Sequence, residues 1–273
     1  MRDRIRSVAV ALALFTPAII AAQDMAPPKF LQITREVVKP GKDLAHSKSE
    51  AGWARSLEAA KYPATSLGMS AQSGPNEMWW LNGYGSMAEV QKVNDAVDAS
   101  PALTAVGATY GPPEADYVSN TIGMIARFRD DISYSSGTPM TAVRFFLVTR
   151  VVVRTGMGDQ FTEARKLIKA AHEKVKAADG YGIYQVTAGA PAGTFLIFSG
   201  RKSLAELDND PHGPAYVAAL GGPEGQKKLT DMQIAYQASA STDLFKLDPT
   251  ISVLDKSWAA ADPFWKRKAV AKK

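Results

Sequence analysis

The chain has 273 residues, of which 46% are hydrophobic, with no cysteine and a formal net charge of +5. The lack of cysteine excludes disulfides, thiolate catalysis, cysteine-based metal sites and a lipid-modified cysteine. The positive charge is concentrated in residues 1–22 and 255–273, and the body between them is close to neutral. This distribution does not indicate a nucleic-acid-binding protein.

The first 22 residues have the order of a secretory signal peptide. Arginines at positions 2, 4 and 6 precede an apolar run from Val8 to Ile20, and two alanines follow. The run is short for a membrane span, and an uncleaved anchor is the alternative interpretation. A cleaved signal on a chain without disulfides predicts a periplasmic or secreted protein. After cleavage, no segment is expected to cross a bilayer.

The first half, residues 30–134, is expected to mix strands and helices. A β-branched stretch predicts a strand at 31–39, and a helix capped by Asp43 follows it to about residue 61. Alternating apolar residues around a Gly-Pro turn predict a hairpin of 66–73 and 77–84. The other predicted elements are helices at 86–94, from residue 100 to a break at 111–113, and at 114–127, followed by a short strand at 131–134.

Residues 135–141 are a predicted linker, and residues 142–247 repeat the order of the first half. The strand at 142–154 aligns without gaps with the first strand, so that Arg150 falls on Arg35. The remaining predicted elements are a helix after residue 159 with one apolar stripe, a hairpin of 180–188 and 194–200, a helix near 226–238 and a strand at 242–246. Residues 248–273 are predicted to be a basic C-terminal tail that stays solvated or rests on an anionic surface.

Strand–helix–strand–strand–helix–strand is the ferredoxin-like arrangement, in which helices cover one face of an antiparallel sheet. In the strand at 142–154, Phe146, Val148 and Arg150 share a face that is too apolar to remain in water. We therefore expect an α+β protein in which two tandem ferredoxin-like repeats pack their sheets face to face. Arg35 and Arg150 would then be related by approximate two-fold symmetry.

This organisation resembles the dimeric α/β-barrel superfamily, which includes antibiotic-biosynthesis-type monooxygenases, NIPSNAP-like proteins and EthD-like proteins. The resemblance rests on the doubled order of elements and on two pairs of helix openings, SMAEV and SLAEL, and ASPAL and HGPAY. It covers residues 30–134 and 142–247 and implies an intrachain barrel. Members of such families bind small, often aromatic molecules in the half-barrels. Some oxidise them without a cofactor, and others bind haem.

Two groups of residues are candidates for chemistry. Arg35 and Arg150 could clamp a carboxylate or phenolate, because a guanidinium offers a planar fork of donors, or each could pair with an acid across the interface. The resemblance implies that His212, with Asp210 close to it, is a catalytic residue or a haem ligand. The alternative is that Asp210 only caps the following helix.

Aromatic side chains form a third group of candidates. Trp80, Phe146 and Tyr184 could line a ligand pocket, and plain core packing is the alternative for each. The histidines at 46, 172 and 212 show no HxxxH or HExxH spacing, so no metal site is predicted. The glycines of NGYGSMA have dinucleotide-fingerprint spacing, but they follow the second arm of a hairpin and are interpreted as a turn.

The leading functional hypothesis is therefore the binding of a small, largely apolar molecule in one or both half-barrels, with a carboxylate read by Arg35 or Arg150. A second hypothesis is a cofactor-independent or haem-dependent monooxygenase-like enzyme that uses His212. A third is a non-catalytic structural or partner-binding module whose half-barrels are filled by their own side chains. Whether the protein is an enzyme is left open by the sequence.

Overall fold

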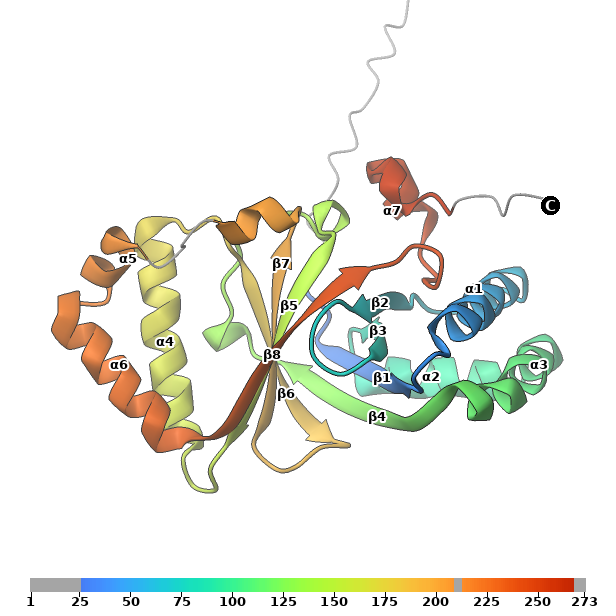
Figure 1. Ribbon diagram of the computed structural model, residues 1–273, viewed down its shortest axis with the longest axis horizontal. Coiled ribbons are helices and arrows are strands. Elements are labelled where there is room, and N and C mark those ends of the chain that lie inside the picture. Colours follow the sequence, from blue (N-terminus) through green and yellow to red (C-terminus); the bar gives the residue numbers. More distant parts are fainter. Residues whose placement is uncertain (1–25, 209–212, 268–273) are drawn as a thin grey trace, which may run out of the picture.

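The computed structural model describes residues 26–208 and 213–267, in which eight strands form one closed barrel with helices on two opposite sides (Figure 1). The strand order is β1-β3-β2-β8-β5-β7-β6-β4, and every neighbouring pair is antiparallel. The predicted signal peptide, together with Asp210 and His212, lies outside the described residues. Within those residues no helix combines the length and apolar character that a membrane span requires.

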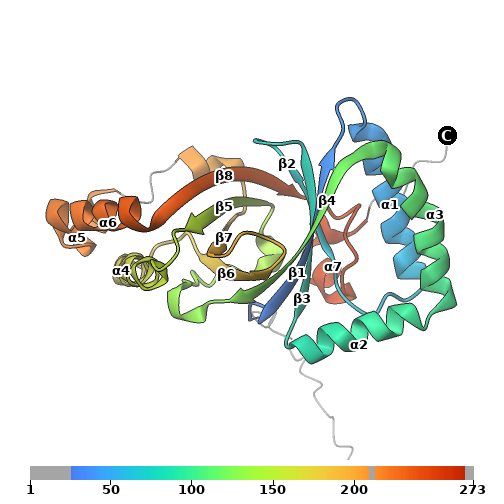
Figure 2. The same cartoon turned by 90° about the horizontal axis from the view of Figure 1, so that it is seen from below.

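The two halves of the chain contribute four barrel strands each, and their helices lie on opposite sides of the barrel (Figure 2). The first half consists of β1 (Phe30–Val38), α1 (Asp43–Ala59), β2 (Leu67–Ala71), β3 (Glu77–Tyr84), α2 (Met87–Asp98), α3 (Pro101–Tyr117) and β4 (Val118–Phe128). The second half consists of β5 (Phe145–Val153), α4 (Gly158–Val175), β6 (Tyr181–Ala188), β7 (Thr194–Arg201), α5 (Pro214–Ala219), α6 (Gly222–Tyr236) and β8 (Gln237–Leu247), and α7 (Lys256–Ala261) follows it.

Strands β1 and β5 occupy equivalent places on opposite sides of the barrel. Both are nine residues long and have the same order of buried and half-buried positions. The register of β1 with β4 shifts after Val37, and the register of β5 with β8 shifts after Val152. Replacing every strand by its counterpart moves the ring by half a turn, so an approximate two-fold axis runs along the barrel. Arg35 and Arg150 therefore face each other across the interior.

Most of the barrel interior is a packed apolar core. Alternate residues of each strand point inward, as the period-two pattern predicted, so that Ile33, Phe146 and Val148 lie in the interior cluster. The residues between them, such as Val151 and Val153, pack under the helices with Phe161 of α4. The prediction that the Arg-containing face of β5 is buried inside and the other face lies under helices is confirmed.

The prediction of a solvated tail is wrong for residues 248–267. Val253 forms a bridge with Ser66, and the side chains of Trp258 and Trp265 are each 5% exposed and belong to the interior cluster. Trp265 Nε1 also donates a hydrogen bond to the carbonyl oxygen of Thr141, at 2.7 Å, just before β5 begins. The segment covers one end of the barrel because burial of its aromatic side chains is more favourable than keeping the whole segment, with its lysines, in solvent. Residues 268–273 lie outside the described part of the chain.

The predicted helix at 114–127 is also wrong. Helix α3 continues through Pro112 and Pro113 to Tyr117, and residues 118–128 form β4. The last turn of α3 is held on α1 through Glu114, which accepts a hydrogen bond from Ser49 at 2.8 Å. Strand β4 pairs with both β1 and β6, an environment that outweighs its local sequence preference. The same junction recurs in the second half, where β8 begins at Gln237, immediately after α6, and not at residue 242.

Candidate functional site

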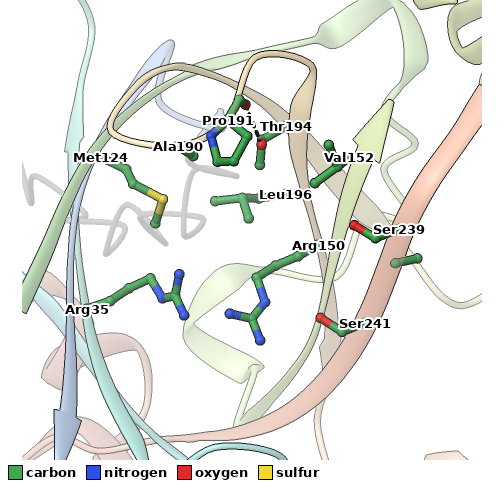
Figure 3. Close-up of a pocket in the computed structure, with 11 residues that line it drawn as sticks. Arg35, Met124, Arg150, Val152, Ala190, Pro191, Thr194, Leu196, Ser239 and Ser241 are labelled. Atoms are coloured by element: carbon green, nitrogen blue, oxygen red, sulfur yellow. Dashed lines mark hydrogen bonds between the residues drawn. The ribbon is translucent and has the colours of Figure 1, made fainter. Parts of the chain in front are cut away.

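A cavity of about 290 Å³, whose lining is drawn in Figure 3, lies inside the barrel at the end opposite α7. Arg35 and Arg150 extend into it from β1 and β5, and their guanidinium groups point towards each other. The rest of the wall is mostly apolar, with a few hydroxyl groups. The lining residues are Arg35, Met124, Arg150, Val152, Ala190, Pro191, Thr194, Leu196, Ser239, Ala240 and Ser241.

Both arginines are paired with buried acids. Arg35 Nη2 lies 2.6 Å from Glu77 Oε1, and Arg150 Nη1 lies 4.0 Å from the same oxygen. Arg150 Nη2 also donates a hydrogen bond to Asp243 at 2.7 Å. Trp79 supports this network, since its Nε1 donates to Glu77 at 2.7 Å and its ring lies 4.7 Å from the Arg35 guanidinium carbon. Pairing with an acid, which the sequence left as one of two possibilities, is therefore what the structure shows.

The residues around the two arginines break their two-fold symmetry. Glu77 on β3 pairs in register with Val37, whereas the equivalent residue opposite Val152 on β7 is Thr194. In the same way, Asp243 on β8 corresponds to Met124 on β4. The acids are thus gathered on one side of the arginines. Within the described residues, no protein acceptor binds Arg35 Nη1 or Arg150 Nε, so these two donors can form hydrogen bonds to a molecule in the cavity.

The turn between β6 and β7 forms part of the cavity rim through Ala190 and Pro191. It lies against β4 so closely that a Cβ on Gly189 would be 2.0 Å from the carbonyl oxygen of Gly123. Gly189 also has a φ of +89°, which side chains disfavour.

We expect Gly189→Ala to lower the free energy of unfolding by about 1–3 kcal/mol, because strain and a backbone clash act together. Urea denaturation measures the change. Gly156→Ala is the matched control, since its φ of +82° is similar but nothing lies within 4 Å of the added Cβ. Equal losses in the two variants would show that the close approach to β4 contributes nothing.

The three aromatic residues predicted to line a ligand pocket lie elsewhere. Trp80 lies on the helix-facing side of β3, where its Nε1 donates to the carbonyl oxygen of Ile251 at 3.2 Å, and the tryptophan inside the barrel is Trp79. The prediction that Trp80 lines the pocket is therefore wrong, because Trp79 and Trp80 lie on opposite faces of β3 and Trp79 is the inward residue. Phe146 and Tyr184 do face inward, yet they pack into the filled part of the core and do not line the cavity.

The described part of the cavity wall offers no histidine to bind a haem iron. His46 and His172 both lie on the helix-facing sides of the sheets, where His172 Nδ1 is 2.9 Å from the carbonyl oxygen of Ile168. The resemblance-based candidate His212 falls outside the described residues, so its predicted role is neither supported nor opposed by this geometry.

A second polar cluster lies on the outer face of β1, under α1 and α3. Three glutamates surround His46 Nε2, with the nearest oxygens of Glu36, Glu114 and Glu50 at 2.8, 3.1 and 3.9 Å. All four residues are buried, and His46 is fully so. The rings of Trp80 and Tyr117 flank the imidazole edge-on, with ring centroids 6.3 and 6.4 Å from the imidazole centroid.

The close packing of these groups shifts their pKa values. Burial alone would lower the pKa of His46, but its contacts with Glu114 and Glu36 outweigh burial and raise it to about 9. Burial and the neighbouring carboxylates of Glu114 and Glu36 raise the pKa of Glu50 to about 9. Burial acts to raise the pKa of Glu114, yet contacts with His46 and Ser49 hold it below its usual range.

This cluster was not predicted from the sequence, because spacings between histidines alone do not reveal it. His46 and Glu50 are one helical turn apart in α1, which places both side chains on one face. That spacing was visible in the sequence. Glu36 and Glu114 were not predictable partners, since they come from a strand and from a helix whose end was misplaced.

The closed barrel and its flanking helices define the ferredoxin-like dimeric α/β-barrel fold, and solved structures share it. An anthrone oxidase-like protein matches with a TM-score of 0.54 and 12% identity, over 84% of this chain and 95% of that chain. A candidate monooxygenase from Fusobacterium nucleatum subsp. nucleatum ATCC 25586 matches with a TM-score of 0.51 and 10% identity, over 82% and 94% of the two chains. At these identities the similarity concerns the fold alone. No family model and no curated protein matches the sequence.

Proposed function

We propose that the protein binds a small, largely apolar molecule in the barrel cavity and that Arg35 and Arg150 hold an acceptor oxygen of this ligand. The observation that carries the proposal is the pair of guanidinium groups that point into an otherwise mostly apolar cavity (Figure 3). Ligand sites commonly combine an apolar lining with a few converging polar groups. The volume of about 290 Å³ suits a ligand of one or two rings.

The acids beside the arginines limit which oxygens the site prefers. Glu77 and Asp243 balance the two positive charges, so a ligand need not be an anion to enter. The donors left on Arg35 and Arg150 suit a ring carbonyl or a phenolic oxygen as well as a carboxylate. We therefore assign an aromatic carbonyl or carboxylate compound as the ligand class.

The proposal is tested with 1-naphthoic acid and the uncharged 1-naphthaldehyde as probes, by quenching of tryptophan fluorescence and by calorimetry. Saturable binding of either probe to the wild-type protein is expected. Asp243→Asn removes the carboxylate that pairs with Arg150, so Arg150 can bind the carboxylate of 1-naphthoic acid instead. The affinity for 1-naphthoic acid should therefore increase by about 10-fold or more, the effect expected of one hydrogen bond between charged groups. Binding of the aldehyde should change far less.

Arg150→Gln/Asp243→Asn is the matched variant, because it removes the donor group while leaving no unpaired charge from this ion pair. It should bind both probes more weakly than the wild type. Absence of saturable binding to the wild type, or equal affinities in all three proteins, would contradict the proposal. Absence of binding by these probes would favour a structural or partner-binding module over the binding of a small ligand.

A second candidate function is a monooxygenase-like enzyme that oxidises the molecule held in the cavity. It is favoured by the fold shared with an anthrone oxidase-like protein and with a candidate monooxygenase. Oxygen uptake by the purified protein with anthrone as the probe tests this function, and His212→Ala tests the part assigned to His212. No uptake above that of buffer would rule out oxidation of this probe.

Two further parts of the proposal concern origin and location. We infer that the halves arose by tandem duplication of a NIPSNAP-like unit, supported by the matching lengths, burial patterns and register shifts of β1 and β5. Residues 1–22 are proposed to direct export to the periplasm or medium. Cell fractionation and N-terminal sequencing of the mature protein test export, and an intact Met1 in the cytoplasm would oppose it.

A further inference from the structure

We infer that Glu36, His46, Glu50 and Glu114 form a binding site for a divalent first-row transition metal ion of the Zn²⁺, Fe²⁺ or Mn²⁺ type. The four side chains converge from β1, α1 and α3, and one ligand atom from each lies within 4.8 Å of all the others. The site is separate from the barrel cavity, which lies on the other face of β1.

The four side chains have too few hydrogen-bond donors among them. His46 Nε2 carries at most one proton, and the closest acceptor is Glu36 Oε2 at 2.8 Å. Ser49 supplies one further donor, to Glu114 Oε1. Glu50 Oε1 and Glu114 Oε2 are buried without a hydrogen-bond partner within the described residues, and Glu50 is only 6% exposed. Buried carboxylate oxygens without donors are costly, so without a cation one of these carboxyl groups has to hold a proton, whereas a cation would satisfy all of the oxygens.

The spacing of the ligand atoms is close to that of a metal-coordination shell. Tetrahedral coordination with bonds of about 2.1 Å places ligand atoms about 3.4 Å apart. The distances of 2.8, 3.1 and 3.9 Å from His46 Nε2 to the three carboxylates bracket this value. His46 and Glu50 lie one turn apart on α1, as paired metal ligands on a helix often do. Small side-chain movements would therefore suffice to form the site.

In its described residues, the second half of the fold is built without such a cluster. Positions aligned with Glu36, His46 and Glu50 hold Val151, Phe161 and Arg165. Phe161 is fully buried and stacks on Phe195 with ring centroids 4.2 Å apart. Since apolar side chains fill two of these places in the second half and an arginine occupies the third, the fold does not require the acids and histidine of the first half.

The ligand set and its surroundings indicate which ions fit. Imidazole suits zinc and iron, and carboxylates suit manganese and magnesium, so one nitrogen with three carboxylates favours Zn²⁺, Fe²⁺ and Mn²⁺ over Cu⁺. A groove between α1 and α3 offers a route for entry. Ser49 connects the groove with the proposed metal site, because it lines the groove and donates a hydrogen bond to Glu114. The groove is lined by Gly41, Leu44, Ala45, Lys48, Ser49, Thr109, Tyr110, Pro113 and Tyr117.

The test measures binding of Zn²⁺ and Mn²⁺ to the chelator-stripped full-length mature protein. Calorimetry should give one ion per chain, and thermal denaturation with the ion at 100 times its dissociation constant should raise Tm by about 5 °C or more. Water-proton relaxation with Mn²⁺ gives an independent readout of the bound ion.

Glu50→Gln is the decisive variant, because the amide keeps the shape and adds donors for the neighbouring carboxylates. It should weaken metal binding at least about 100-fold, at or above the upper limit for residues that only support a ligand. Without metal, its Tm should equal or exceed that of the wild type, since the buried acceptors gain a donor. Glu58→Gln, on the exposed side of the same helix, is the matched control and should bind metal as the wild type does.

Loss of the metal-induced shift in Glu50→Gln with retention in Glu58→Gln supports the site. Absence of binding to the wild-type protein overturns the inference. Equal binding by the wild type and both variants also overturns it, because the ion would then lie elsewhere. A fall in the metal-free Tm of Glu50→Gln would show that the cluster serves the fold. None of these results depends on whether the barrel cavity binds a ligand.

Discussion

Glu77→Ala is expected to lower the free energy of unfolding by about 3–5 kcal/mol, because it leaves a buried guanidinium without its partner. Glu77 is 4% exposed, and it accepts hydrogen bonds from Arg35 and from Trp79 Nε1. Asp243 still pairs with Arg150 in this variant, so Arg35 bears most of the loss. Chemical denaturation gives the free energy, and Tm should fall by about 10 °C.

The double variant Arg35→Met/Glu77→Leu separates the charge effect from packing. Replacement of a buried ion pair by apolar residues of similar size is often nearly neutral, so the double variant should recover much of the stability, less the cost of leaving Trp79 Nε1 without its acceptor. Asp231→Asn, on the surface of α6, should change stability by no more than about 0.5 kcal/mol. A loss no larger than this in Glu77→Ala would mean that the ion pair contributes nothing to the barrel.

Trp265→Ala is expected to cost about 3–5 kcal/mol, the range for truncating a buried tryptophan. Its ring contacts Trp258 and Phe264, with centroids 4.8 Å away in each case, and the three aromatic rings close one end of the barrel. The variant should also bind the dye ANS more strongly, because the apolar interior becomes accessible from that end.

Trp53→Ala on α1 is the control for the loss of a tryptophan as such. Trp53 is half-buried and stacks on Tyr110 with ring centroids 6.1 Å apart, so its removal should cost about 1–2 kcal/mol. Urea denaturation of both variants decides the comparison. If Trp265→Ala were no more destabilised than Trp53→Ala, the segment after β8 would contribute nothing special to the stability of the barrel.

The repeated strand was the feature of the sequence that predicted most of the fold. The period-two pattern of β5 identified the buried face, and its alignment with β1 predicted that Arg35 and Arg150 would meet. The errors fell where local sequence and tertiary pairing disagree. Residues 118–128 become a strand because β1 and β6 flank them, and Trp258 becomes buried because the barrel end needs a cover.

The candidate sites were predictable to different degrees. A pair of arginines could be inferred from one alignment, but the acids Glu77 and Asp243 that neutralise them could not, since each comes from another strand. Trp79 and Trp80 illustrate the limit of pattern reasoning, because both faces of β3 are covered and alternation alone does not identify the inner one. The cluster around His46 required the register of three separate elements.

Closure of the barrel within a single chain has a kinetic consequence. All eight strands have partners on both sides, and the pairs that join the halves, β2 with β8 and β4 with β6, link segments of one polypeptide. Assembly of this barrel is therefore a unimolecular reaction, so its rate and midpoint should be unaffected by dilution. The two halves are also always present in a one-to-one ratio. Each half packs against the other half and not against an identical copy, so the residues of the two halves can diverge independently.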